Sequence, residues 1–269
     1  IDGNIIDTIV YREWFKNRSA FRPGLDFTPE EDGIIRIKRE SSGIKDATLL
    51  KLEDNFRDTM AVFGSEPPIW VDRFFSLNRF DRSFRFKTEE LFSETDLLYE
   101  NEHNIKIVTP GQYGLTSFAW HYLLRLWKEQ KVFGIYIDCG LVKRGRIETV
   151  IDRQLSAFGK SKSDVGKIII DNWNMSDKDA RTIIQKLNSD FPNRQILILC
   201  PLLEKRLAET EIVTNGEFNF INMFMAPLQT YQVRSMVGIY NKRLRIGDED
   251  RILKRLNADI LDFNMHRTS

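Results

Sequence analysis

The stretch that decides the fold is residues 105–117, Ile-Lys-Ile-Val-Thr-Pro-Gly-Gln-Tyr-Gly-Leu-Thr-Ser. Three of its first four residues are β-branched, which is typical of a buried strand. Gly111 and Gly114 then permit a tight turn, and residues 116–128 carry apolar side chains at helical spacing. A glycine-containing turn between a strand and a helix can bind phosphate, because backbone N–H groups and the positive end of the helix dipole point at the anion.

This turn matches only part of the phosphate-binding motif G-x-x-x-x-G-K-[ST]. Thr109 stands at the first glycine position, and Leu115 stands where the motif has its lysine. A charge-assisted hydrogen bond contributes about 1.5–3 kcal/mol. We therefore expect triphosphate to bind more weakly by at least about one to two orders of magnitude, with little or no hydrolysis. The candidate nucleotide-binding residues are Thr109, Gly111, Gln112, Tyr113, Gly114, Leu115, Thr116 and Ser117.

A second element of nucleotide sites is an apolar strand that ends in a carboxylate. Residues 168–171, Ile-Ile-Ile-Asp, have this pattern. Thr116 and Asp171 are the candidate ligands of a nucleotide-bound Mg²⁺, since this ion prefers oxygen ligands. Asn172 follows in place of a second carboxylate that could activate water. Two alternatives stay open: Asp171 only caps the next turn, and the turn at 109–117 no longer holds a nucleotide.

Short apolar strands alternate with helices through the middle of the chain. This order predicts an α/β fold with a parallel sheet covered by helices on both faces. A small β-rich segment with strands at 5–11 and 33–38 precedes it, and two helices at 228–243 and 248–261 form a lid after it. The other predicted strands cover 105–108, 132–137, 167–170, 195–199 and 218–225, and the other predicted helices cover 46–62, 116–128, 147–158 and 178–191.

The chain is therefore expected to have four parts. Residues 1–65 are β-rich, residues 66–100 are a linker, residues 101–227 are the NTPase-like domain, and residues 228–269 are a helical subdomain. Aromatic and arginine residues alternate from Trp70 to Phe86, and this pattern has two interpretations. In the first, the stretch binds single-stranded nucleic acid by stacking and charge. In the second, the rings pack on the next domain while the arginines stay solvated.

Composition limits the class of protein. Lys and Arg total 40 against 39 Asp and Glu, a net charge of +1, which gives no overall electrostatic footprint for nucleic acid or a membrane surface. No apolar run approaches the roughly 18 residues of a membrane span. Two cysteines, Cys139 and Cys200, do not suggest a disulfide framework and favour a cytoplasmic location. The start at Ile1 indicates a piece of a longer protein. The three histidines are far apart and predict no metal cluster.

Taken together, these stretches resemble the STAND class of signal-transducing P-loop ATPases. They most resemble bacterial members fused behind a calcineurin-like metallophosphoesterase and implicated in antiphage defence. The resemblance implies a P-loop NTPase fold with ATP or ADP and Mg²⁺ as cofactors, and it places the phosphoesterase metal ligands upstream of Ile1. It is carried by residues 105–117, 168–171, 195–201, 218–229 and 260–268, and by residues 11–15, which are similar to the closing strands of a phosphoesterase.

We therefore expect a regulatory nucleotide-binding switch with weak or no ATP hydrolysis, within a larger defence or signalling protein. Its partners would be other domains or protomers of the same protein. The first alternative is a pseudo-NTPase scaffold for protein assembly, motivated by Leu115 and Asn172. The second is nucleic-acid binding through residues 70–86. The sequence lacks G-x-S-x-G, H-E-x-x-H and C-x-x-C motifs, so no catalytic residue is predicted.

Overall fold

The chain divides into two compact units, residues 1–68 and 69–269. The predicted strands at 5–11 and 33–38 lie outside the described residues, as do 111–113 of the phosphate loop. The computed structural model describes residues 46–61, 68–77, 91–110, 114–140, 142, 147–173, 177–202, 220–245 and 247–262.

In the first unit, the described element is helix α3 (Ala47–Met60), which matches the helix predicted over 46–62. Its buried residues include Leu52, Phe56 and Met60. Residues spaced by four positions lie on the same helix face, so the apolar spacing in the sequence directly gives the buried face of this helix.

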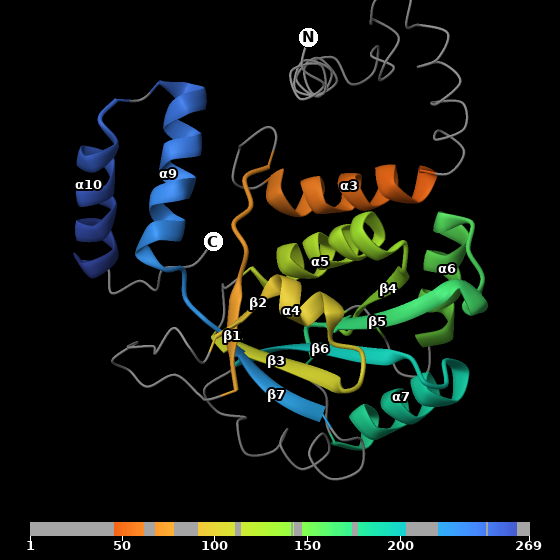
Figure 1. The fold of residues 1–269 in the computed structure, drawn as a ribbon. Helices are drawn as coiled ribbons and strands as arrows, with labels where there is room; N and C mark the ends of the chain where they lie inside the picture. Colours follow the sequence, from red (N-terminus) through yellow and green to blue (C-terminus); the bar gives the residue numbers. More distant parts are fainter. Residues whose placement is uncertain are drawn as a thin grey trace, which may run out of the picture. The chain divides into compact units, whose positions relative to one another are not determined.

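The second unit is built on a seven-stranded sheet with the order β2-β1-β7-β3-β6-β5-β4 (Figure 1). Strands β7, β3, β6, β5 and β4 are parallel, while β1 pairs antiparallel with both β7 and β2. The strands are β1 (Phe74–Ser76), β2 (Phe92–Ser93), β3 (Asn104–Pro110), β4 (Phe133–Asp138), β5 (Val165–Asp171), β6 (Gln195–Leu202) and β7 (Phe220–Met225).

Helices cover both faces of this sheet. Helices α6 (Ile147–Phe158) and α7 (Asp177–Asp190) share one apolar cluster with alternate residues of β4, β5 and β6. On the other face, Lys167 of β5 donates a hydrogen bond to Tyr122 of α5 (Leu115–Gln130). Because both faces are covered, Ile168, Ile169 and Ile170 of β5 form a continuous apolar run rather than an alternating one. The predicted α/β fold, with a mostly parallel sheet between helices, is confirmed.

The described part of residues 66–100 differs from the expected linker. It supplies β1 and β2 to the sheet, and α4 (Glu94–Tyr99) to the face covered by α5. The ring of Phe75 is fully buried and lies 5.4 Å from that of Phe118 on α5. This segment packs against the domain because it covers apolar surface that would otherwise face water.

Arg73 also departs from expectation, since it is 1% exposed rather than solvated. Its guanidinium lies 5.4 Å from the centroid of the Trp70 ring. The two side chains therefore pack on each other, and not in the arrangement expected for stacking on a nucleic-acid base. Within the described residues, packing on the domain therefore accounts for the aromatic stretch from Trp70 to Phe75. Residues 78–90 lie outside the described part.

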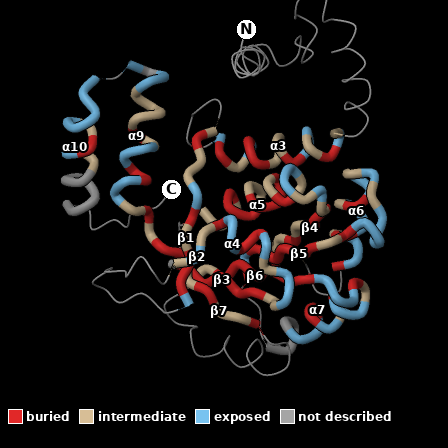
Figure 2. The backbone as a smooth tube through the Cα atoms, in the orientation of Figure 1, coloured by how far each residue is buried: buried red, intermediate tan, exposed pale blue. Residues whose placement is uncertain are grey.

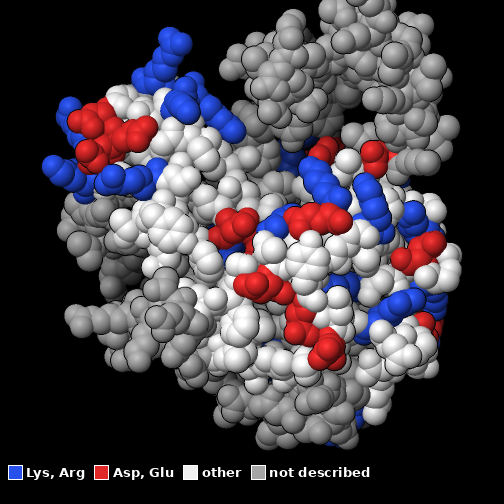
Figure 3. Space-filling model, viewed as in Figure 1, with Lys and Arg blue, Asp and Glu red and all other residues white. Residues whose placement is uncertain are grey.

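Two helices follow β7, as the sequence predicted: α9 (Thr230–Leu244) and α10 (Glu249–Asp262). Val233, Val237 and Leu253 form a small apolar cluster between them. Figure 2 shows that burial is concentrated in the sheet and α5, while much of α9 and α10 is exposed. Basic and acidic side chains are interspersed on the face shown in Figure 3, and the exposed pair Arg234–Asp250 lies 3.4 Å apart.

No helix within the described ranges is long and apolar enough to cross a membrane.

Candidate functional site

The glycine turn lies between the carboxyl end of β3 and the amino-terminal end of α5. Gly114 is the residue before the helix, with φ 71° and ψ 36°. This is the left-handed region, which glycine adopts without steric cost, so the backbone here favours a glycine. Gly114 therefore lies where the sequence predicted, before the helix that follows β3 and near the strand edge where ligands bind in parallel α/β sheets.

Thr116 and Asp171, 55 residues apart in the sequence, meet at this edge. The Thr116 hydroxyl donates a hydrogen bond of 2.6 Å to Asp171 Oδ2. Asp171 is the last residue of β5 and is fully buried. Strand β6 lies between β3 and β5, so the contact depends on α5 crossing over the sheet from the end of β3.

A third side chain, Tyr136 of β4, completes this group. Its hydroxyl donates to the same Asp171 Oδ2 at 2.8 Å. Burial and the neighbouring Asp171 carboxylate raise the pKa of Tyr136, so the phenol stays neutral and acts as a donor. We name Thr116, Tyr136 and Asp171 the hydroxyl–carboxylate triad. Sequence reasoning missed Tyr136, because it lies inside a strand and only the register of β4 with β5 brings it here.

Asn172 links the ends of β5 and β4. Its backbone N–H donates to Asp171 Oδ1 at 2.8 Å, and its Nδ2 donates to Asp138 Oδ1 at 2.9 Å. The Asp138 oxygen also accepts the Gly140 N–H at 2.8 Å. Asn172 has φ 54°, a left-handed conformation that asparagine tolerates. An amide here organises the strand ends but cannot serve as a base for water.

The other predicted site residues that the structure describes lie in β3 and in the first turn of α5. Thr109 is 1% exposed, and its hydroxyl has no hydrogen-bond partner within the described part of the chain. Ser117 is buried, whereas Leu115 is partly exposed as the first residue of α5. A buried hydroxyl without a partner is uncommon, so the end of β3 has hydrogen-bonding capacity to offer a ligand. Gly111, Gln112 and Tyr113 lie outside the described residues.

Lys167, the buried lysine of β5, does not replace the missing lysine of the motif. Its Nζ donates to the Leu98 and Glu100 carbonyls at 3.1 and 3.0 Å and to the Tyr122 hydroxyl at 2.9 Å. Desolvation lowers the pKa of Lys167 to about 8. It precedes Asp171 by four strand residues, roughly 13 Å along β5. This lysine therefore holds the carboxyl-terminal end of α4.

The triad offers the kind of oxygen atoms that Mg²⁺ binds, but not all of them are available. The Thr116 hydroxyl keeps its lone pairs, so it fits a metal ligand. Both lone pairs of Asp171 Oδ2 are taken by Thr116 and Tyr136. Oδ1 accepts the Asn172 N–H within the described residues and keeps one acceptor site, so this oxygen can still face a metal or its bound water. The described residues contain no group of three or more His, Cys, Asp or Glu side chains that could hold a metal.

Both cysteines are buried and unpaired. Burial, with Asp138 and Asp171 nearby, raises the pKa of Cys139 to about 12, and burial also raises the pKa of Cys200. Neither thiol is poised to act as a nucleophile, because the thiolate is the reactive form.

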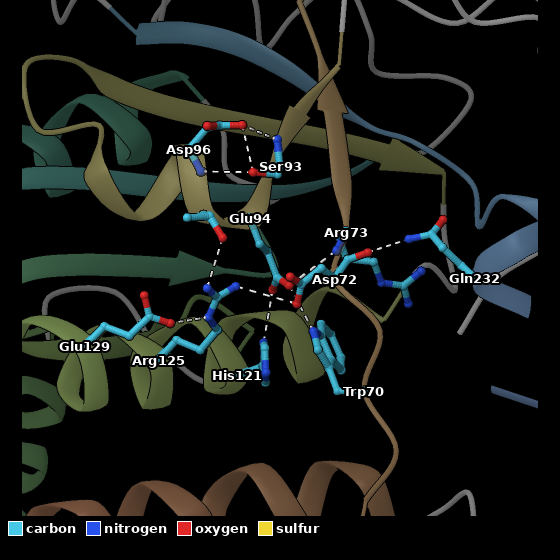
Figure 4. A network of polar contacts seen from close by, with 11 residues as sticks. Trp70, Asp72, Arg73, Ser93, Glu94, Asp96, His121, Arg125, Glu129 and Gln232 are labelled. Atoms are coloured by element: carbon cyan, nitrogen blue, oxygen red, sulfur yellow. Dashed lines mark hydrogen bonds and ion pairs between the residues drawn. The ribbon is translucent and has the colours of Figure 1, made fainter. Parts of the chain in front are cut away.

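A second polar network surrounds Glu94, the first residue of α4 (Figure 4). Glu94 Oε2 accepts the Trp70 Nε1–H at 3.0 Å, and Oε1 lies 3.1 Å from His121 Nδ1. Trp70 and His121 stack with ring centroids 4.4 Å apart. Nearby, Gln232 of α9 donates to the Asp72 carbonyl, which ties the helical pair to this network. His121 is thus a packed structural residue.

No protein-family model matches this sequence, and no curated protein matches it. Among solved structures, the chain is similar to the replication initiator DnaA bound to AMPPCP and single-stranded DNA. That match has 12% identity and a TM-score of 0.43 over 61% of this chain and 53% of that chain. AMPPCP-bound DnaA from Aquifex aeolicus is similar at 13% identity and a TM-score of 0.41, with the same coverage of 61% and 53%.

The chain is also similar to the DnaC helicase loader, with 17% identity and a TM-score of 0.29 over 46% of this chain and 79% of that chain. The chain spans about half the length of the two DnaA chains, 53% in each case. At these values the similarity assigns neither a family nor a function to the chain.

Proposed function

We propose that this chain is a regulatory nucleotide-binding module that takes ATP or ADP at the turn between β3 and α5. The observation that carries the proposal is the 2.6 Å hydrogen bond between Thr116 and Asp171. It brings the hydroxyl of the loop motif and the carboxylate of the apolar strand together, as a nucleotide site requires. The αL conformation of Gly114 and the amino-terminal end of α5, whose first residue follows this glycine, support phosphate binding at the turn.

Hydrolysis is expected to be weak or absent. Leu115 offers no cation to the phosphates, Lys167 is engaged elsewhere, and Asn172 cannot accept a proton from water. Charge stabilisation in the transition state is commonly the largest catalytic contribution. The site keeps groups for binding but lacks the lysine of the motif and a base for water. This combination supports nucleotide sensing rather than hydrolysis.

The helical pair α9–α10 supports a switching role. It follows β7 directly and is held to the Asp72 segment through Gln232. Nucleotide that binds one arrangement of this pair more tightly would shift the population toward it. The sequence suggests a STAND-type context, a cytoplasmic protein of antiviral defence. In that context, other domains or protomers of the same protein would respond to the change in conformation.

Calorimetric titration of residues 1–269 with ATP and Mg²⁺ tests the proposal. We expect weak but measurable binding, and Thr116→Val should weaken it about tenfold, because it removes the hydroxyl of the loop motif that would hold the nucleotide-bound Mg²⁺. Thr59→Val is the matched control, since Thr59 donates only locally to the Phe56 carbonyl in the first unit. Absence of heat at millimolar ATP would refute the nucleotide proposal.

The second candidate is a pseudo-NTPase scaffold for protein assembly. The same two departures from the motif, Leu115 and Asn172, favour it. If ATP does not bind and sedimentation shows concentration-dependent self-association of the chain, the scaffold becomes the better description.

A further inference from the structure

The helical pair α9–α10 is docked on residues 70–74, which we call the strap. We propose that the strap couples the helical pair to α5, and that Gln232 is the joint between the pair and the strap. The inference rests on the proposed function, because α5 begins at the turn proposed for nucleotide. It names the route by which a change at that turn reaches the helical pair. Gln232 is then a positioning residue, since it acts through the strap.

The strap contacts the helical pair at three described places. Val71 packs against the apolar cluster between α9 and α10. The ring of Phe74 meets that of Tyr231 edge to face, with centroids 6.5 Å apart. Gln232 donates a hydrogen bond to the Asp72 carbonyl. Because much of α9 and α10 is exposed (Figure 2), we expect the pair to open locally while the sheet stays folded.

Gln232 also holds the start of α9. Its Oε1 accepts the Gln229 N–H at 2.7 Å as part of a capping box, while its Nε2 donates to the Asp72 carbonyl. Gln232 is 4% exposed. One buried amide thus fixes both the first turn of α9 and the position of that turn on the strap. Loss of this amide should release the start of the helix, and the helical pair with it.

The strap is also held to α5. The Trp70 ring stacks on that of His121 with centroids 4.4 Å apart, and Glu94 contacts both side chains, at 3.0 and 3.1 Å. The Asp72 carboxylate lies 3.6 Å from Arg125 Nη1. The Asp72 side chain is half-exposed, and an ion pair of this kind contributes little. The ring stack and the buried Glu94 therefore provide most of the hold on α5.

Asp72 thus lies between α5 and α9, with Arg125 on one side and Gln232 on the other (Figure 4). Thr116, in the first turn of α5, and His121 are five residues apart, about one and a half helical turns. A ligand that displaces α5 at its start would therefore move the surface on which the strap packs. The strap would carry this movement to Gln232. Such coupling is reciprocal, so docking of the helical pair would in turn favour one position of α5.

Hydrogen–deuterium exchange of residues 1–269 measures docking, because exchange of the α9 and α10 amides reports local opening. Gln232→Met removes the joint and keeps an unbranched side chain. Gln195→Met is the matched control, because Gln195 is a buried glutamine whose Nε2 likewise donates to a backbone carbonyl, that of His103, at 2.6 Å. His121→Phe alters the α5 side of the strap and keeps a ring against Trp70.

We expect Gln232→Met to speed exchange in α9 and α10 about tenfold and His121→Phe about threefold, with a smaller change at β5 in each case. Gln195→Met should stay within about twofold of the parent at α9 and α10. The double variant of His121→Phe and Gln232→Met should match Gln232→Met alone, because both changes act through the strap. Parent-like exchange in Gln232→Met overturns the joint. A His121→Phe effect that is absent, or that multiplies with that of Gln232→Met, overturns the coupling to α5.

A second arm, with ATP and Mg²⁺, separates this inference from the proposed function. Where calorimetry shows binding, ATP should change exchange in α9 and α10 at least about fivefold in the parent and less than about twofold in Gln232→Met. An equal change in both proteins overturns the strap as the route and leaves the proposed function standing. Absence of heat overturns the proposed function and the nucleotide signal together. The exchange rates without ATP then decide whether the strap docks the helical pair.

Discussion

Replacement of Glu94 by alanine should destabilise the second unit more than any surface substitution. Glu94 is 0% exposed, and its two oxygens contact three groups from two other segments, the stretch before β1 and helix α5. Oε2 accepts from Trp70 Nε1 at 3.0 Å and from the Arg73 backbone N–H at 3.3 Å, while Oε1 faces His121 Nδ1 at 3.1 Å (Figure 4). The carboxylate therefore joins α4, α5 and the segment before β1.

The magnitude follows from what the substitution leaves behind. Each buried donor that loses its acceptor costs about 1–3 kcal/mol, and Trp70, Arg73 and His121 all lose theirs. Because these costs overlap, we expect Glu94→Ala to lower the free energy of unfolding by about 3–5 kcal/mol. Glu94→Gln keeps one acceptor oxygen for Trp70 and Arg73 and should cost about 1–2 kcal/mol, since charge-assisted bonds become neutral ones.

Urea unfolding followed by tryptophan fluorescence measures both values, with Trp70 as a reporter beside the substituted residue. The control is Glu102→Ala, a change at an exposed glutamate, which should stay within about ±0.5 kcal/mol. If Glu94→Ala costs less than about 1 kcal/mol, the network does not hold these segments together and the reasoning fails.

Four further predictions follow. Burial alone would raise the pKa of Glu94, but hydrogen bonds from His121 and Trp70 outweigh it and lower the pKa below 4.5; the stability difference between the parent and Glu94→Gln should therefore be complete above about pH 5 and shrink as the pH falls through the folded-state pKa. Leu115→Lys should tighten ATP binding about tenfold or more; equal affinity of parent and variant would contradict the view that the lost lysine limits binding. The pKa of Lys167 is about 8 when folded and 10.5 ordinarily, so the unfolded state holds more protons between these values; urea unfolding should show the parent gaining stability relative to Lys167→Met from about pH 8 to about pH 10. Cys139 and Cys200 should not react with a thiol reagent until the chain unfolds, since burial raises the pKa of both thiols; rapid labelling of the native chain would count against this.

The fold could be predicted because the apolar periodicity of a helix or a strand depends only on residues close together in the sequence. The apolar run of β5 and the helical spacing of α5 both gave elements close to those observed. Helix α6 has the predicted limits of 147 and 158. The described part of residues 66–100 differed because β1 is only three residues long. A strand of this length is too short to show an alternating apolar pattern, so it can be recognised only from its pairing with β7.

The candidate site was predicted in part. Gly114, Thr116 and Asp171 could be recognised, because a strand–turn–helix order and a strand ending in Asp are sequence patterns. Tyr136 could not, since an aromatic residue inside a strand is ordinary core material until its neighbours are known. His121 and Glu94 belong to the same case, because nothing in a spacing of 27 residues indicates a hydrogen bond.

The sequence by itself determined that a glycine turn joins a buried strand to a helix, and that no lysine stands in that turn. Those properties depend on neighbours along the chain. The tertiary structure alone decided which oxygens of Asp171 are occupied, because β6 separates the loop strand from the Asp171 strand and β4 carries Tyr136 to the same carboxylate. Hydrogen bonds act over about 3 Å, so their partners are selected by strand order and register, which residue types alone do not specify.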